Sequence, residues 1–107
     1  MADELKTEFV WKNGELIKFE EATTHILTHS LHYGSGVFEG IRCYYDEERD
    51  MSNVFRLKEH MQRLVDSCKI CKLPLEYSVD ELCEADVETI RANKLTARYN
   101  YLIYTSD

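Results

Sequence analysis

The sequence predicts an α+β fold, in which a small antiparallel sheet of two hairpins plus a later strand carries two packed helices. Two observations lead to this prediction. Short runs rich in β-branched and aromatic residues occur in pairs around turn signals in the first half of the chain. Two amphipathic stretches follow them, before one last apolar and aromatic run. Strands that precede the helices, rather than alternate with them, favour antiparallel pairing.

The first expected hairpin lies near the start of the chain. Residues 9–11 form a short apolar strand, Asn13-Gly14 is a strong two-residue turn signal, and residues 16–19 form the return strand. Residues 20–32 are polar and mixed, so we expect a loop there with at most a short helical turn.

The second expected hairpin follows a cluster of glycines. Residues 37–45 are rich in β-branched and aromatic residues and predict one long strand. The charged residues 46–50 form the turn, and residues 53–56 form the partner strand.

Residues 57–72 predict the first helix, which Pro74 ends. Its apolar positions follow helical spacing and are Leu57, Met61, Leu64, Val65, Cys68 and Cys71. Ser78 and Glu81 form a capping-box pattern that starts the second helix, which we expect to reach about Asn93. Its apolar candidates are Leu82, Ala85, Val87 and Ile90. Residues 98–105 predict the last strand.

Length and composition indicate one compact domain, residues 1–107. Apolar residues make up 44% of the chain and charged residues 31%, which is typical of globular proteins. The net charge of −7 argues against nucleic-acid binding, which needs clustered Lys and Arg. No apolar run is long enough to cross a membrane, and the N-terminus lacks the pattern of a signal peptide. We therefore expect a cytoplasmic protein.

The cysteines and histidines carry no strong metal signal. Cys68 and Cys71 form a CxxC without the second CxxC of a zinc ribbon, so we expect two small, partly buried thiols on one helical face. His25, His29 and His32 have helical spacings but lack the HExxH pattern. We expect no metal site.

The candidate binding region combines glycines with aromatic and charged residues. Gly34, Gly36 and Gly40 fall within seven residues, where they let the backbone approach a ligand closely. Tyr33 and Phe38 are suited to an apolar pocket, and Arg42 is suited to binding a carboxylate. The residues alone indicate a small anionic or amphipathic ligand. The alternative is a hairpin with packed aromatic residues and an exposed arginine.

A second candidate cluster lies on the first helix. His60 and Arg63 are one turn apart and share a face. Arg63 is placed to pair with a phosphate. The alternative is a solvated surface arginine.

Three stretches of the chain closely resemble the branched-chain amino-acid aminotransferases of the class IV family, which use pyridoxal phosphate (PLP). They are residues 11–15 (WKNGE), 31–42 (LHYGSGVFEGIR) and 55–64 (FRLKEHMQRL), and the resemblance extends from about Phe9 to Leu102. It implies the N-terminal small domain of such an enzyme, which transfers the amino group between leucine, isoleucine or valine and 2-oxoglutarate.

The resemblance also implies roles for individual residues. Arg63 matches the arginine that binds the PLP phosphate. The positions that match the pocket for the branched aliphatic side chain are Tyr33, Phe38 and Gly40. Arg42 matches an arginine near the substrate, and Glu39 lies in the same motif. An aromatic-walled pocket selects aliphatic side chains by burying methylenes.

The family's catalytic lysine, which forms a Schiff base with PLP, has no match in this sequence. None of the seven lysines falls at its family position, and we expect it in a second, downstream domain. The resemblance thus implies one wall of the site without a catalytic residue. We expect the chain alone to be inactive and not to retain PLP, and the family's dimeric sites imply a homo-oligomer.

The last strand departs from the family pattern of Tyr-Ile-Arg-Pro. Asn100 stands where the arginine that helps bind the substrate carboxylate is expected, and Tyr101 stands where proline is expected. Arg98 lies two residues earlier and shares the strand face of Asn100, so it is the candidate replacement.

Two other interpretations stay open. In the first, the chain is a non-catalytic, shortened homologue that acts as an oligomerising interaction module through its exposed aromatic pocket and open sheet edge. Alternatively, it belongs to a complete enzyme whose lysine domain lies beyond residue 107.

Overall fold

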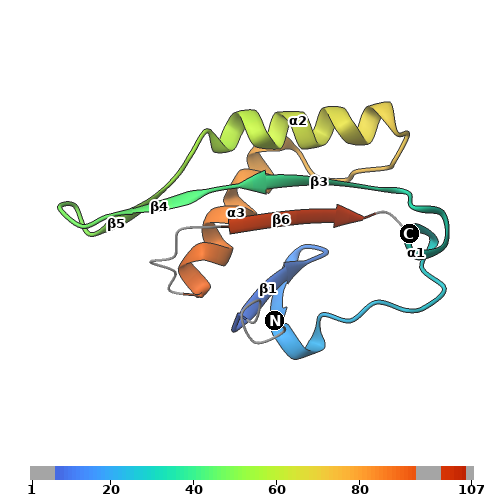
Figure 1. Ribbon diagram of the computed structural model, residues 1–107, viewed down its shortest axis with the longest axis horizontal. Helices are drawn as coiled ribbons and strands as arrows, with labels where there is room; N and C mark the ends of the chain where they lie inside the picture. Colours follow the sequence, from blue (N-terminus) through green and yellow to red (C-terminus); the bar gives the residue numbers. More distant parts are fainter. Residues whose placement is uncertain (1–6, 94–99, 106–107) are drawn as a thin grey trace.

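The computed structural model describes residues 7–93 and the backbone of residues 100–105. Figure 1 shows the order of the elements along the chain. They are β1 (Phe9–Lys12), β2 (Glu15–Lys18), the 3₁₀ turn η2 (Phe19–Glu21), α1 (His29–Tyr33), β3 (Gly36–Ile41), β4 (Cys43–Asp46), β5 (Met51–Val54), α2 (Leu57–Ile70), α3 (Val79–Ala92) and β6 (Asn100–Thr105). This content confirms the α+β class.

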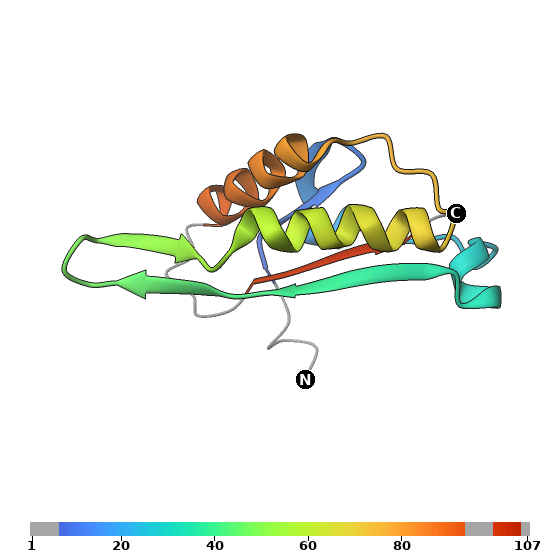
Figure 2. The same ribbon diagram turned by 90° about the horizontal axis from the view of Figure 1, so that it is seen from above.

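The strands, which we expected in one small sheet, form three two-stranded antiparallel sheets in the described part of the chain. β1 pairs with β2 around Asn13-Gly14, as the turn signal predicts. β4 pairs with β5, and this hairpin extends past the start of α2 in Figure 2. β3 pairs with β6, so the last described strand lies beside a strand from the middle of the chain.

The prediction of one long strand over residues 37–45 was wrong. The strand breaks at Arg42, so β3 and β4 have different partners. Arg56, expected in the partner strand, adopts a left-handed backbone with φ 50° and caps the start of α2. The partner of β3 lies about sixty residues downstream, and strand composition alone does not identify a partner at that distance.

The first helix ends at Ile70 rather than at Lys72. Lys72 adopts a left-handed backbone with φ 56°, and the Leu73 N–H donates to the Cys68 carbonyl at 2.8 Å. The Lys72 N–H donates to the Lys69 carbonyl at 3.2 Å, which completes a Schellman-type stop. Cys71 therefore lies just outside the helix and is exposed, contrary to the expectation of two partly buried thiols on one helical face.

The capping box at the start of α3 is confirmed. The Ser78 Oγ accepts from the Glu81 N–H, and the Glu81 carboxylate accepts from the Ser78 N–H, both at 3.1 Å. These bonds satisfy two of the amides that a helix start leaves without intrahelical partners.

We expect Ser78→Ala to lower the free energy of unfolding by about 1 kcal/mol, because the Glu81 amide loses its acceptor. Urea denaturation followed by circular dichroism measures the change. Ser67→Ala, in the last turn of α2, is the control for a serine that is not an N-cap. A loss for Ser78→Ala no larger than that of the control would contradict the capping role.

The core lies where α2 packs between β3 and α3. Its buried cluster joins Ile41 of β3 to Met61 and Leu64 of α2 and to Leu82 of α3. Asn93, directly after α3, links this helix to β1. Its side chain accepts from the Phe9 N–H at 2.8 Å and donates to the Phe9 carbonyl at 3.0 Å. The helices therefore fix the positions of β3 and β1.

Candidate functional site

The two faces of β3 differ sharply, and this difference organises the candidate site. Glu39 and Ile41 are buried on the face that meets α2, whereas Phe38 and Gly40, which alternate with them along the strand, are exposed. This is the two-residue alternation of a strand with one covered face. An ionisable Glu39 on the covered side needs partners, because burial of an unpaired carboxylate is costly.

Glu39 meets two side chains of α2. The Arg63 Nε donates to the Glu39 Oε2 at 2.7 Å, and the Arg63 Nη2 donates to the Oε1 at 2.6 Å. The His60 Nδ1 lies 2.8 Å from the same Oε1. An ionised carboxylate only accepts hydrogen bonds, so this contact places the proton on Nδ1. Three donors therefore hold one buried carboxylate.

The pairing sets the ionisation of both partners. The Arg63 hydrogen bonds hold the pKa of Glu39 below its usual 4.5, helped by His60, although burial of the carboxyl opposes the shift. The same contact raises the pKa of Arg63. The cluster is thus an ion pair, with Glu39 charged at neutral pH.

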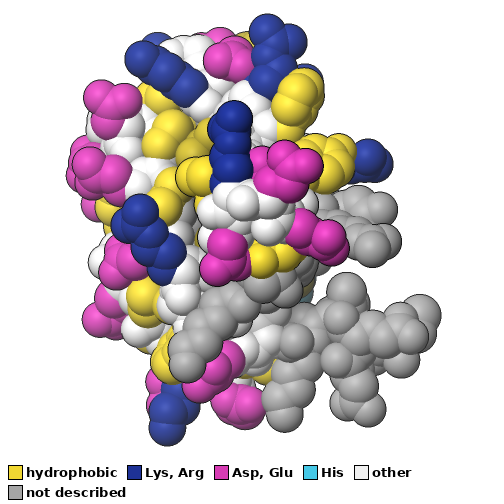
Figure 3. Space-filling view, turned by 90° about the vertical axis from the view of Figure 1, so that its left-hand side faces the viewer, with side chains coloured by type: hydrophobic (Ala, Val, Ile, Leu, Met, Phe, Trp, Pro, Cys, Tyr) yellow, Lys and Arg dark blue, Asp and Glu magenta, His cyan; other side chains and the backbone are white. Residues whose placement is uncertain are grey.

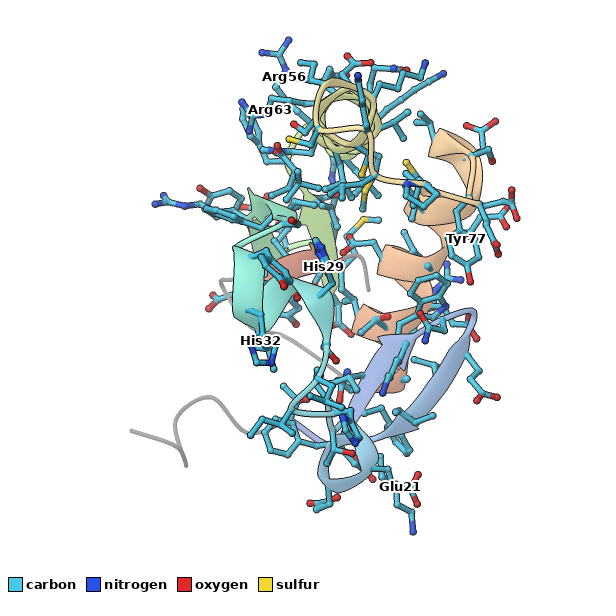
Figure 4. The ribbon with its side chains drawn as sticks, turned by 90° about the vertical axis from the view of Figure 1, so that its right-hand side faces the viewer. Glu21, His29, His32, Arg56, Arg63 and Tyr77 are labelled. Carbon is cyan, nitrogen blue, oxygen red and sulfur yellow. The ribbon has the colours of Figure 1, made fainter. Side chains whose placement is uncertain are left out.

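Arg63 spans the boundary between the protein and solvent. Its side chain is 66% exposed, whereas Glu39 is 5% exposed. Figure 4 looks along α2 and shows Arg63 and Arg56 on the same side of that helix. The two contacts to Glu39 use Nε and Nη2, and Nη1 donates to no other side chain within the described residues. The guanidinium keeps a donor edge for an anion.

The predicted pocket residues are all exposed. The side chains of Tyr33, the last residue of α1, and Phe38 are 74% and 73% exposed. Tyr33 stacks in a tilted arrangement on His29, at a ring-centroid distance of 4.6 Å. A Cβ built on Gly40 meets nothing within 4 Å. Phe38 and Gly40 lie on the exposed face of β3, whereas Arg63 contacts Glu39 on the face that α2 covers.

The arginines predicted to bind carboxylates are placed differently. Arg42 is exposed at the break between β3 and β4, where its carbonyl accepts from the Phe55 N–H at 2.9 Å. Arg98 lies outside the described residues. The geometry therefore links Glu39, His60 and Arg63 into one cluster.

Sequence reasoning missed the part that Glu39 plays. A signal was present in the strand pattern. Val37, Glu39 and Ile41 are two residues apart and therefore share one face, so an acid lies between two apolar residues on that face. His60 and Arg63 likewise share one helix face. These two faces meet because α2 packs on β3. The residues that meet are 21–24 positions apart along the chain, and no local pattern predicts a contact at that separation.

The histidines and cysteines are the remaining candidates for a metal site. The described residues contain no group of three or more His, Cys, Asp or Glu side chains that could hold a metal ion. Cys43, Cys68, Cys71 and Cys83 are all free thiols, and burial raises the pKa of Cys68.

Within the described part, no helix is long and apolar enough to cross a membrane. Figure 3 shows acidic and basic side chains intermingled around hydrophobic ones at the end that carries the β4–β5 hairpin.

Comparison with known proteins gives consistent matches. The family model described as amino-transferase class IV matches residues 36–107. The branched-chain-amino-acid aminotransferase of Escherichia coli K12 is 48% identical over 103 residues, which cover 95% of this chain and 33% of that protein.

Solved structures agree with these matches. A crystal structure of the E. coli branched-chain amino acid aminotransferase superposes with a TM-score of 0.85 at 46% identity, covering 95% of this chain and 33% of that one. The branched-chain amino acid aminotransferase of Thermobaculum terrenum, solved in its PLP-form, gives 0.80 at 35% identity, covering 92% and 33%. The chain thus spans about a third of the length of the relatives it matches.

Proposed function

Because this chain belongs to the class IV aminotransferases, we propose that it forms one wall of the active site of a PLP-dependent branched-chain aminotransferase. The reaction transfers the amino group between leucine, isoleucine or valine and 2-oxoglutarate. Relatives that cover 84–95% of the chain at 44–48% identity carry the name of this activity, which supports the assignment. The same relatives disfavour the alternative of a non-catalytic interaction module.

The observation that carries the proposal is the exposed guanidinium of Arg63, held by a buried carboxylate. A phosphate group prefers a planar arginine donor with free N–H groups, and the outer edge of Arg63 offers them. The residues present therefore fit the phosphate of PLP. The Thermobaculum terrenum relative was solved with PLP, which supports this choice of cofactor.

Within this site, the bound PLP supplies an electron sink for the amino-group transfer. Arg63 binds and orients the cofactor phosphate. Tyr33, Phe38 and Gly40 form the pocket for the aliphatic substrate side chain. The two aromatic side chains contact it and exclude water from it. Arg42 holds a substrate carboxylate, and Arg98 replaces the family arginine at the last strand.

The organisation of the protein around this site is part of the proposal. Residues 1–107 form one domain that corresponds to the small N-terminal domain of the relatives. The catalytic lysine comes from a segment outside this chain, and a second copy of the protein completes a homo-oligomer. The exposed apolar side chains of Tyr33 and Phe38 support a surface that other parts of the assembly cover. The cytoplasmic location stays a prediction.

The test measures cofactor affinity in the protein that carries this chain. Arg63→Gln removes the charge and the fork, and we expect the dissociation constant for PLP to rise tenfold or more, as for loss of about 1.5–3 kcal/mol of charge-assisted hydrogen bonding. Spectrophotometric titration measures it.

Arg56→Gln is the matched control, because Arg56 lies on the same side of α2 and pairs with the exposed Glu59 at 2.9 Å. Equal PLP affinity in the wild type and in Arg63→Gln would overturn the assignment of the phosphate site.

A further inference from the structure

We propose that Glu39 is a positioning residue that fixes Arg63 for phosphate binding, with His60 fixing Glu39 in turn. This inference rests on the proposed function and deepens it, because it adds two residues that act on the cofactor through a third. Glu39 touches neither the substrate nor the phosphate in this arrangement. Its role is to hold one edge of the guanidinium so that the opposite edge faces the ligand.

The geometry of the cluster supports this role. The carboxylate of Glu39 is buried and comes from β3, whereas Arg63 and His60 come from α2. The two contacts from Arg63, at 2.7 and 2.6 Å, engage both carboxylate oxygens in a fork. The His60 Nδ1 donates to the Oε1 at 2.8 Å as a further contact. The position of Arg63 is thereby tied to the strand as well as to the helix.

The exposure of Arg63 explains why such a tie matters. An arginine that is two-thirds exposed samples many rotamers unless something holds it, and a ligand must then stop that motion on binding. A carboxylate that already engages Nε and Nη2 removes that motion before the ligand arrives. Preorganisation of this kind strengthens binding by lowering the ordering cost.

The negative charge of Glu39, unlike its positioning of Arg63, weakens phosphate binding. A carboxylate beside the guanidinium partly neutralises it and repels a phosphate dianion. A variant that removes the charge therefore mixes lost positioning with relieved repulsion. Glu39→Asp separates the two effects, because it keeps the charge and withdraws the carboxylate by one methylene from a site whose helix and strand are fixed by the core.

The experiment compares the affinities of PLP and of pyridoxal, which lacks the phosphate, in the protein that carries this chain. We expect Glu39→Asp to weaken PLP binding about tenfold and to leave pyridoxal binding unchanged within about twofold. In the Arg63→Gln background, Glu39→Asp is expected to cause no further loss of PLP affinity, because a residue that acts only through Arg63 has nothing left to position.

Glu59→Asp is the control, since Glu59 pairs with Arg56 on the same helix and both side chains are exposed. It should alter neither affinity. Equal losses for PLP and pyridoxal, unchanged or tighter PLP binding, or additive losses in the double variant would each overturn the positioning role. The proposed function survives all of these results as long as Arg63→Gln alone weakens PLP but not pyridoxal. An unchanged PLP affinity in Arg63→Gln overturns both proposals.

Discussion

Leu64→Ala is expected to lower the free energy of unfolding by about 3–5 kcal/mol, the largest loss that we expect from truncating one side chain of this core. Leu64 is 0% exposed and belongs to the buried cluster with Ile41, Met61 and Leu82. Its removal leaves a cavity among α2, β3 and α3, and these three elements cannot all move to fill it.

Urea denaturation followed by circular dichroism measures this loss, and Ile70→Ala is the matched control. Ile70 ends the same helix but is 81% exposed, so its truncation should change the free energy of unfolding by about 0.5 kcal/mol or less. Similar losses for the two variants would show that the packing of α2 on β3 is not the main source of stability.

Glu39→Gln is expected to destabilise the fold by about 2 kcal/mol at neutral pH, because the variant keeps an oxygen acceptor but loses the charge-assisted bonds to Arg63 and His60. The loss stays below the roughly 3–5 kcal/mol typical of a broken buried ion pair, because the Arg63 that remains is largely solvated.

The destabilisation should depend on pH in a defined direction. The pKa of Glu39 is lower in the folded chain than its ordinary value of 4.5, so ionised Glu39 stabilises the fold fully above that value. This stabilisation is lost as the pH falls through the depressed folded pKa. The difference in thermal midpoint between wild type and Glu39→Gln should thus be largest near neutral pH and shrink below the ordinary value of 4.5.

Asp66→Gln on the same helix is a control for an exposed acid, since the Asp66 carboxylate accepts from the neutral Gln62 amide at 3.0 Å. Its midpoint should differ little from the wild type across this range. A Glu39→Gln difference that grows as the pH falls would contradict the assigned ion pair.

Local signals in the sequence were sufficient for several elements. The Asn13-Gly14 turn, the Ser78–Glu81 capping box and the apolar spacing of α2 and α3 each act within a few residues. Their energies come from neighbours along the chain, so they are readable without tertiary structure. The end of α2 was misplaced because Lys72, a residue with no special preference for it, adopts the left-handed stop.

The sequence by itself determined the α+β class, the first hairpin, both long helices and the family motif around β3. Only the tertiary structure decided that β3 breaks at Arg42 and pairs with β6, and that Glu39 holds Arg63 and His60. Contacts between distant segments depend on which faces pack together, and that choice is made by burial of the whole core rather than by any local pattern. The sequence named Arg63 as a phosphate-site candidate, and the tertiary structure added the buried carboxylate of Glu39 that holds it.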